Sequence, residues 1–338
     1  YNPSSTRGAL AVPATRSATA VAHPNVALIK YWGKRPGPGN LPATGSLSIV
    51  LGGLSTTTTV RFEPGLAADE VRLNGGEDPA AAARISACLD TLRARAGVTT
   101  RARVDTRNDF PTGAGLASSA SGFAALVVAA AGALRLDVPA AELGALARAG
   151  SGSAPRSLHG GFAVLQNEGD GTRCEPVAGP ADWPLEVVIA VTTRAAKAVG
   201  SRAGMAESER TSPYYPAWVA THPADLAAGL AAVRARDFAT LAELAEHNCL
   251  KMHAVMFTTR PPLIYWSPAT LAALHTVREL RAAGVPVFFT IDAGPQVKAV
   301  CLPGAASRVA AALAATPGVV EVLRSPLGEG ARLVDAAA

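Results

Sequence analysis

The sequence predicts an α+β fold, and three observations support this class. Runs rich in β-branched residues with alternating polarity occur early, most clearly the Thr-rich stretch at 56–62. Beyond about residue 195 the chain becomes largely helical in character. The C-terminal part then alternates helix, strand, helix and strand, which is typical of helices packed on one face of a sheet.

The composition indicates a core-forming protein. The chain has 338 residues, 49% of them hydrophobic and 17% charged, which fits two domains or one large unit and argues against disorder. The 32 glycines and 25 prolines show no period, so collagen-like and mucin-like classes are excluded. The net charge of +5 is modest and would suit an anionic small molecule as well as a nucleic acid.

Cysteine and histidine spacing predicts neither a disulfide framework nor a metal site. The four cysteines lie far apart without a C-x-x-C pair, and His247 and His253 are not spaced to share a helix face. The start of the chain shows no signal-peptide pattern. The uncharged stretch 110–134 is Ala-rich and lacks an aromatic belt, so we expect a buried helix there and no membrane span.

In the N-terminal half we expect a flexible leader followed by strands and helices. The leader covers residues 1–18, and a first domain covers 19–188. Strand-like runs occupy 18–32, 46–64, 71–75, 100–110, 160–166 and 185–193. Helices are predicted at 80–97, ending at Gly97, after the Gly-rich segment that follows 100–110, and at 139–150, ending at Gly150.

The C-terminal domain is expected to cover 189–338 and to be mainly helical at first. Residues 212–255 read as helix, and a further helix at 267–284 has Ser267 as its N-cap and Gly284 after its end. The remaining elements are expected to be strands at 286–292 and near 293–300, a helix at 306–316 and a strand at 318–325.

The Gly-rich segment 111–122 is a candidate phosphate loop. Glycines there allow close backbone approach, and Ser118 and Ser119 fall at a helix start, where free N–H groups favour an anion. The segment matches neither common nucleotide-binding glycine pattern. A serine-capped glycine turn without a ligand is an equally good interpretation.

Two of the five lysines, Lys30 and Lys34, lie in the apolar run 25–35. In a strand they would point to the same side, and a lysine in such a run needs a partner or a role. The alternative is an edge strand with solvated lysines. The scarcity of lysine in this chain favours a function.

Three further residues carry possible chemistry. Arg156 lies in the Ser/Gly-rich segment 150–161 and could grip a phosphate or carboxylate. Asp292 follows an apolar strand and could be a general base. Arg202 could be another anion ligand. Each also has a plain interpretation, namely an ordinary loop, a turn-initiating Asp and a solvated loop Arg.

In this order, however, the segments resemble the diphosphomevalonate decarboxylases of the GHMP kinase superfamily. The resemblance spans about residues 20–300 and rests on these runs: NVALIKYWGKR, NLPATGSLSIVL, NDFPTGAGLASSASGFAAL, GSGSAPRSLHGGF, SRAGM with TSPYY, HAVMFTTRPPLIYW and FFTIDAGPQVK. It implies the GHMP kinase fold, with an N-terminal domain like domain 2 of ribosomal protein S5. It also implies a ferredoxin-like C-terminal α/β sandwich, with the active site in the cleft between the domains.

The resemblance implies an ATP-dependent lyase of the mevalonate pathway of isoprenoid biosynthesis. Such an enzyme phosphorylates the 3-hydroxyl of mevalonate 5-diphosphate and then releases phosphate and CO₂ to give isopentenyl diphosphate. Asp292 would position or deprotonate the hydroxyl, Lys30 would pair with Asp292, and Arg156 would complete the catalytic set. ATP and Mg²⁺ would be required, and no protein metal ligand is predicted.

The resemblance also assigns binding residues. The substrate would contact Tyr31, Trp32, Gly33, Lys34, Ser151, Gly152, Ser153, Arg156, Ser201, Arg202 and Thr211. ATP would contact Pro111, Gly113, Ala114, Gly115, Leu116, Ala117, Ser118 and Ser119. A homodimer in the cytoplasm, with no membrane or nucleic-acid partner, is the family expectation.

Four positions depart from the family pattern: Gly113, Pro155, Gln296 and Gly76. Gly76 stands where some members carry an Arg near the diphosphate, which puts recognition of that tail in question. The same reaction on mevalonate 5-phosphate, a 3-kinase without decarboxylation, a plain small-molecule kinase of the superfamily, and a basic nucleic-acid-binding protein therefore remain alternatives. The set Lys30, Asp292 and Arg156 favours decarboxylation, and Lys34 favours a phosphorylated tail.

Overall fold

The fold was analysed in a computed structural model, which describes residues 15–110 and 118–334. Sheets and helices are both abundant, so the α+β class is confirmed. The first strand begins at Arg16, so residues 16–18 of the expected leader belong to a strand. Within the described ranges no helix is long and apolar enough to cross a membrane.

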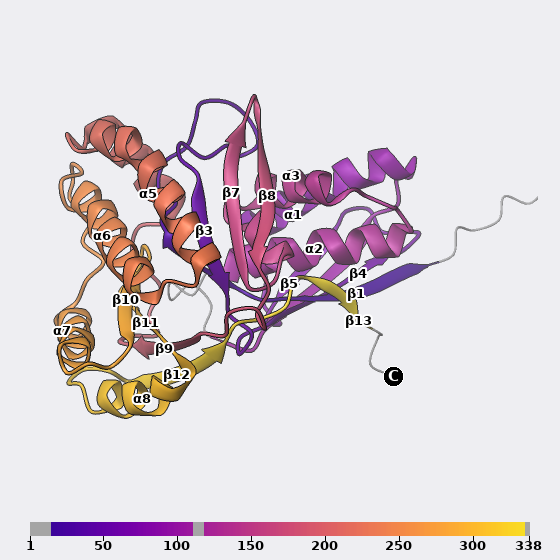
Figure 1. The fold of residues 1–338 in the computed structure, drawn as a ribbon. Coiled ribbons are helices and arrows are strands. Elements are labelled where there is room, and N and C mark those ends of the chain that lie inside the picture. Colours follow the sequence, from indigo (N-terminus) through magenta and orange to yellow (C-terminus); the bar gives the residue numbers. More distant parts are fainter. Residues whose placement is uncertain (1–14, 111–117, 335–338) are drawn as a thin grey trace, which may run out of the picture.

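The first sheet joins the two ends of the described chain. Its order is β13-β1-β4-β6-β5, antiparallel except for the β5–β6 pair. The strands are β1 (Arg16–Ala22), β4 (Thr56–Phe62), β5 (Glu70–Leu73), β6 (Ala102–Asn108) and β13 (Arg332–Val334). The C-terminal strand β13 was not predicted; it pairs with β1 beside the helices in Figure 1.

Three helices accompany the first sheet. They are α1 (Pro79–Ala96), α2 (Ser118–Leu134) and α3 (Ala140–Gly150). Helix α2 packs on β1 and β4, with α1 and α3 against it. Its many buried alanines allow close packing on the sheet, which confirms the expected buried helix. Gly97 ends α1 in the left-handed conformation, as predicted, because glycine has no Cβ to clash there.

The second sheet has the order β2-β3-β7-β8. Its strands are β2 (Asn25–Ile29), β3 (Ser46–Val50), β7 (Phe162–Glu168) and β8 (Gly171–Ala178). Strand β8 was missed, since its residues are mostly half-buried and show no clean alternation. The expected strand run 18–32 is divided into β1 and β2, and β2 ends at Ile29, so neither Lys30 nor Lys34 lies in it. The short helix η1 (Ala154–Leu158) precedes β7.

The third sheet is antiparallel with the order β10-β11-β9-β12. Its strands are β9 (Glu186–Val191), β10 (Val287–Ile291), β11 (Val297–Cys301) and β12 (Glu321–Pro326). With helices between β9 and β10 and between β11 and β12, this is the expected ferredoxin-like arrangement. Strand β9 spans the expected domain boundary at 188/189.

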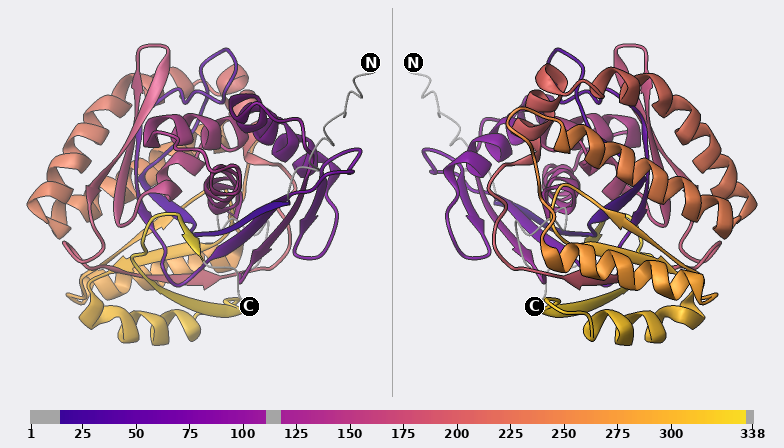
Figure 2. Two further views of the ribbon diagram at one scale, coloured as in Figure 1. Left: turned by 90° about the vertical axis from the view of Figure 1, so that its right-hand side faces the viewer. Right: turned by 90° about the vertical axis from the view of Figure 1, so that its left-hand side faces the viewer.

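The remaining helices surround the second and third sheets. They are α4 (Ser201–Thr211), α5 (Tyr215–Ala235), α6 (Phe238–Phe257), α7 (Pro268–Ala282) and α8 (Ala306–Ala314), with the short η2 (Pro303–Ala305). Figure 2 shows the orange and yellow helices on the outer side of the C-terminal sheet. The expected cap of α7 is confirmed, because Ser267 and Thr270 form a reciprocal capping box.

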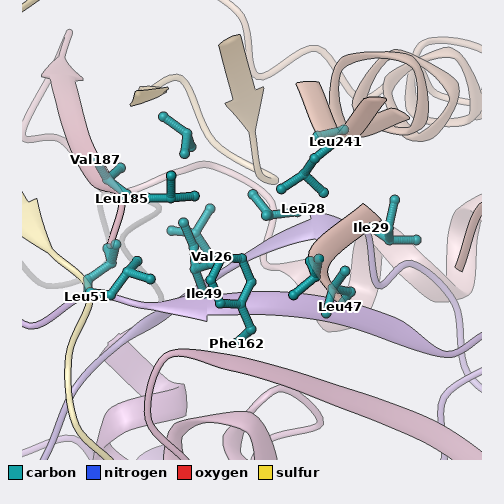
Figure 3. Close-up of a cluster of buried hydrophobic side chains, with 14 of the residues drawn as sticks. Val26, Leu28, Ile29, Leu47, Ile49, Leu51, Phe162, Leu185, Val187 and Leu241 are labelled. Carbon is teal, nitrogen blue, oxygen red and sulfur yellow. The ribbon is translucent and has the colours of Figure 1, made fainter. Parts of the chain in front are cut away.

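Strand β9 contributes side chains to two hydrophobic cores, because its alternate residues face opposite sides of the sheet. Val187, Ile189 and Val191 belong to the core shared with the second sheet, whereas Val188 and Ala190 face the core under α7 and α8. Figure 3 shows the shared core, where Leu185 and Val187 belong to one cluster with Val26 of β2 and Ile49 of β3. Strands β9, β10 and β11 are therefore buried on both faces, and β10 contacts β2 where the Thr290 hydroxyl donates to the Ala27 carbonyl at 3.4 Å.

Candidate active site

A cavity of about 430 Å³ opens where the second and third sheets meet. Its walls come from the residues after β2, the start of α2, the α3–η1 loop, α4 and the residues after β10. Predicted site residues that line it are Lys30, Tyr31, Trp32, Lys34, Ser118, Ser119, Ser151, Gly152, Ser153, Arg156, Ser201, Arg202 and Asp292. Segments far apart in the sequence thus converge on one space.

Some predicted residues are not brought to this cavity. Gly33 does not line the cavity and instead packs against Tyr215, whose hydroxyl oxygen would lie 2.1 Å from a Cβ at this position. Thr211 lies at the end of α4, where its hydroxyl accepts from the Arg260 amide at 2.8 Å. The expected ATP contacts Pro111, Gly113, Ala114, Gly115, Leu116 and Ala117 lie outside the described residues.

Asp292 follows β10 directly and lies between two lysines. Lys30 Nζ is 2.6 Å from Asp292 Oδ1, and Lys298 Nζ is 3.3 Å from Oδ2. The expected Lys30–Asp292 pair is confirmed. Burial alone would raise the pKa of Asp292, but the two ammonium groups outweigh it and hold the pKa well below its usual range. Asp292 is therefore an ionised, weakly basic carboxylate.

The end of β2 explains why a lysine is buried here. Lys30 leaves the ladder, and its backbone N–H donates to Asn248 Oδ1 at 2.7 Å. Only 1% of the Lys30 side chain is exposed, whereas the Asp292 side chain keeps 25% exposure toward the cavity. The ammonium is thus paired and desolvated, and the carboxylate still faces the space where a ligand would bind.

Arg156 lies in η1 and is 2% exposed. Its Nε donates to Asn25 Oδ1 at 3.2 Å, its Nη1 contacts Ser46 Oγ, and its guanidinium carbon lies 5.9 Å from the centroid of the Tyr31 ring. Burial lowers the pKa of this guanidinium. In the described part of the chain it has no carboxylate ion pair, so its charge is available to an anion in the cavity.

Asn25 is a cavity residue that sequence reasoning missed. Its Nδ2 donates to Ser157 Oγ at 2.8 Å, and its Oδ1 accepts from Arg156. Asparagine at the start of a buried strand was the available signal, since a buried amide needs partners.

Serine hydroxyls connect the start of α2 to the α3–η1 loop. Ser119 Oγ lies 3.2 Å from Ser151 Oγ, which lies 3.3 Å from Ser153 Oγ. Gly150 allows this approach, because a Cβ there would lie 2.0 Å from Phe123 Cδ1 of α2. The hydroxyls and the start of α2 present a set of neutral donors beside the lysines.

Three further cations lie close together in the cavity lining. They are Lys34, Arg84 and Arg202. Burial and the nearby Arg202 and Arg84 lower the pKa of Lys34 to about 8. Among the described residues none of the three forms an ion pair with a carboxylate. This excess of positive charge would favour a polyanionic group.

Arg84 and Lys197 are functional candidates that the sequence analysis missed. Arg84 lies on α1 over the Phe123 ring, whereas Gly76, the position held in question, lies in the β5–α1 turn outside the cavity lining. Lys197 Nζ donates to Ser201 Oγ at 2.7 Å and to the Ala293 carbonyl at 3.0 Å. The scarcity of lysine was the signal for Lys197. Arg84 had none, because arginine is common here.

Two family models match this chain. The diphosphomevalonate decarboxylase-like N-terminal domain matches residues 22–175, and the mevalonate 5-diphosphate decarboxylase C-terminal domain matches residues 187–320. The diphosphomevalonate decarboxylase of Aspergillus fumigatus is 38% identical over 302 residues, which cover 82% of this chain and 75% of that protein. A phosphomevalonate decarboxylase of Haloferax volcanii is 36% identical, over 83% of this chain and 86% of that protein.

Solved structures agree with these matches. A structure described as MDDEF in complex with MVAPP, AMPPCP and magnesium is 37% identical, covers 96% of this chain and 100% of its own, and has a TM-score of 0.87. Mevalonate diphosphate decarboxylase from Staphylococcus aureus is 35% identical, covers 95% and 99%, and has a TM-score of 0.89. The expected GHMP kinase fold is confirmed. Sequence motifs, fold and relatives agree, and the chain belongs to the diphosphomevalonate decarboxylase family.

Proposed function

We propose that this protein catalyses the ATP-dependent decarboxylation of mevalonate 5-diphosphate to isopentenyl diphosphate, in the mevalonate pathway of isoprenoid biosynthesis. One observation carries the proposal. The lysine-paired carboxylate of Asp292 faces a cavity in which, among the described residues, Lys34, Arg84, Arg156, Lys197 and Arg202 form no ion pair with a carboxylate. A substrate with one hydroxyl, one carboxylate and one diphosphate complements this arrangement at three points.

We assign the diphosphate tail to the end of the cavity lined by Lys34, Arg84 and Arg202. Three cations suit a diphosphate better than a single phosphate, because each phosphate adds negative charge to be neutralised. The substrate carboxylate then reaches toward Arg156, with Ser151 and Ser153 as neighbouring donors. A buried guanidinium held by neutral partners can bind it without first breaking an ion pair.

This orientation leaves the 3-hydroxyl beside Asp292. The Asp292 carboxylate accepts the hydroxyl hydrogen and aims the oxygen at the γ-phosphate of ATP. Phosphoryl transfer has a loose transition state in which positioning and electrostatics dominate, so a weakly basic carboxylate is adequate. The new O–P bond forms as the bond to ADP breaks, and the hydroxyl proton passes to Asp292 late in the step.

The described residues fit ATP bound with Mg²⁺. Among them there is no cluster of acidic, His and Cys side chains that would hold a metal alone. Mg²⁺ would therefore be brought by the phosphate oxygens of ATP, which it prefers together with water. The hydroxyls of Ser118 and Ser119 at the start of α2 would face the phosphates. When bound, Mg²⁺ neutralises charge on the transferring phosphate, and Lys30 and Lys197 add positive charge from the protein.

Decarboxylation follows from the same arrangement. Phosphorylation converts the tertiary hydroxyl into a good leaving group, and its departure leaves C3 electron-deficient. The C–C bond to the carboxylate breaks, its electron pair forms the C=C bond, and CO₂ leaves. The protein holds phosphate and carboxylate on different cations, with Lys30 and Lys197 for the phosphate and Arg156 for the carboxylate. No separate electron-accepting cofactor is needed for this elimination.

The experiment measures ADP and CO₂ release with Mg-ATP on mevalonate, its 5-phosphate and its 5-diphosphate. Equal ADP and CO₂ on the diphosphate alone is the expected result. The same products on the monophosphate alone would replace the proposal with the activity named for the Haloferax volcanii relative. ADP without CO₂ would indicate a 3-kinase, and no product from any substrate would overturn the assignment.

We also propose a cytoplasmic homodimer with no nucleic-acid partner, and a division into N- and C-terminal domains near residue 188. All four cysteines are free, which fits a reducing compartment. Several surface arginines of the described residues are paired with carboxylates, which reduces the positive charge that they present to a nucleic acid. Light scattering tests the dimer, and salt-dependent binding of RNA would contradict the proposal that the protein has no nucleic-acid partner.

A further inference from the structure

Asn40 bridges a cation of the proposed tail site to the end of a distant helix. Lys34 Nζ donates to Asn40 Oδ1 at 2.6 Å. The Asn40 Nδ2 group donates to the carbonyls of Ala149 at 2.6 Å and Arg148 at 3.2 Å, in the last turn of α3. One amide thus uses both its acceptor and its donor, with partners far apart in the sequence.

The backbone holds Asn40 in this position. Its φ is 54°, in the left-handed region that asparagine tolerates better than most residues. The loop closes where the Arg35 N–H donates to the Leu41 carbonyl at 2.9 Å, and Lys34 pairs with Pro42 in a short antiparallel bridge. The position of the amide is therefore determined by the closed loop and not by Lys34 alone.

Asn40 also separates two spaces. It lines the main cavity and an adjoining cavity of about 340 Å³, and Arg84 and Arg202 line both. Lys34 lines only the main cavity, and its side chain has four rotatable bonds, so without an acceptor its ammonium would not be fixed there. The hydrogen bond to Asn40 keeps it in the main cavity.

We propose that Asn40 is a positioning residue, which holds the Lys34 ammonium toward the substrate tail and ties it to the segment that carries Ser151 and Arg156. The inference rests on the proposed function, in which Lys34 binds that tail. Helix α3 ends at Gly150, directly before Ser151, so the amide links both ends of the substrate site through a short stretch of backbone.

The Asn40 amide accepts from Lys34 without carrying a charge of its own. The charged groups that face Lys34 are Arg202 from α4 and Arg84 from α1. An aspartate at position 40 would pair with Lys34 and cancel charge that the diphosphate needs, and it would lose the donor to α3. An amide orients the ammonium and leaves its charge for the substrate.

The test compares Asn40→Gly and Asn40→Asp with the wild-type enzyme. Glycine tolerates the left-handed backbone and removes the amide, whereas aspartate keeps the shape and adds a charge. Arg236→Gly is the matched control, since Arg236 is an exposed residue with φ 55° at the end of α5. KM and kcat for mevalonate 5-diphosphate are measured from pH 6.5 to 9.5 at saturating Mg-ATP, together with thermal unfolding.

We expect each Asn40 variant to raise KM roughly ten-fold or more at pH 7, with a smaller change in kcat, as for loss of a hydrogen bond to a charged group. The alkaline fall in kcat/KM should move to lower pH in Asn40→Gly, which loses an acceptor that favours the ammonium. It should move to higher pH in Asn40→Asp, because an anion stabilises the ammonium. A merely structural role would not shift this limb in opposite directions.

Two results would overturn the inference. One is an unchanged KM in both variants. The other is a loss of kcat and thermal stability with no shift of the alkaline limb. The variant Lys34→Ala distinguishes failure of this inference from failure of the proposed function. If Lys34→Ala leaves KM unchanged while the wild-type enzyme turns over the diphosphate, Lys34 does not bind the tail and the inference is wrong. If wild type itself fails on the diphosphate, the proposed function has failed instead.

Discussion

The Lys30 ammonium lies 2.6 Å from Asp292 Oδ1, although the two residues are 262 positions apart in the sequence. Lys30 follows the last residue of β2 and Asp292 follows the last residue of β10, so the pair joins the ends of strands from two sheets. Phe288 of β10 packs in the core shared with β2, and Val287, Phe289 and Ile291 pack in the core on the other face of the third sheet. The geometry of this pair therefore depends on how the two sheets pack together.

Asp292→Asn should lower kcat roughly 10³-fold or more while KM changes little, because the amide cannot take the hydroxyl proton. The substitution keeps the shape of the side chain, and thermal unfolding checks that the buried lysines are still accommodated. Single-turnover measurement of ADP formation locates the defect. Near-normal ADP formation would show that Asp292 does not act in phosphoryl transfer.

Arg156→Lys should lower kcat/KM on the order of 100-fold, because one ammonium cannot replace the fork that contacts Asn25 and Ser46 and still bind a carboxylate. Arg324→Lys is the control, since Arg324 pairs with Glu186 on the surface. Steady-state kinetics measure both variants. Equal activity of the two would mean that Arg156 contributes charge only.

Arg84→Ala should raise KM for mevalonate 5-diphosphate roughly ten-fold, in line with loss of one charge-assisted hydrogen bond at a partly exposed site. The matched control is Arg95→Ala on the same helix, where Arg95 pairs with Glu142. Binding of the 5-monophosphate should change less. If the affinities for the 5-diphosphate and the 5-monophosphate fall equally, Arg84 does not bind the second phosphate.

In the free enzyme, kcat/KM should fall as pH rises through about 8, where Lys34 loses its proton. The direction follows from the charge: a lowered lysine pKa means that the binding form, the ammonium, is present below about pH 8 and lost above it. Lys34→Arg should remove this limb, because arginine stays protonated. An identical alkaline limb in wild type and Lys34→Arg would assign the titration to another group.

Arg93 and Asp69 form a buried ion pair away from the cavity, with Nη1–Oδ1 and Nη2–Oδ2 distances of 2.9 Å. Removing one partner leaves the other charge buried, so Arg93→Ala should cost about 3–5 kcal/mol of unfolding free energy. Urea unfolding measures the loss, and kcat at low temperature should be nearly unchanged. A loss below about 1 kcal/mol would contradict the expected cost of a buried, unpaired Asp69.

Local chemistry determined much of the secondary structure. Asn74 and Gly75 form a turn with φ of 49° and 80°, and the ends of α1 and α7 agree with their predicted capping residues. These features depend on neighbouring residues only, so sequence patterns report them well. Helix α4 was missed because its polar residues resemble a loop; only Gly204, Met205 and Ser208 are buried within it.

The sequence by itself determined the family, the motif residues and the chemistry they imply, because each motif is a short run with its own residue types. Tertiary structure alone decided which of these residues share a cavity. It placed Lys298 against Asp292, brought Arg84 to the cavity and left Gly33 and Thr211 outside the cavity lining. Such contacts join separate strands and helices through the packing of three sheets, and no local pattern in the chain records them.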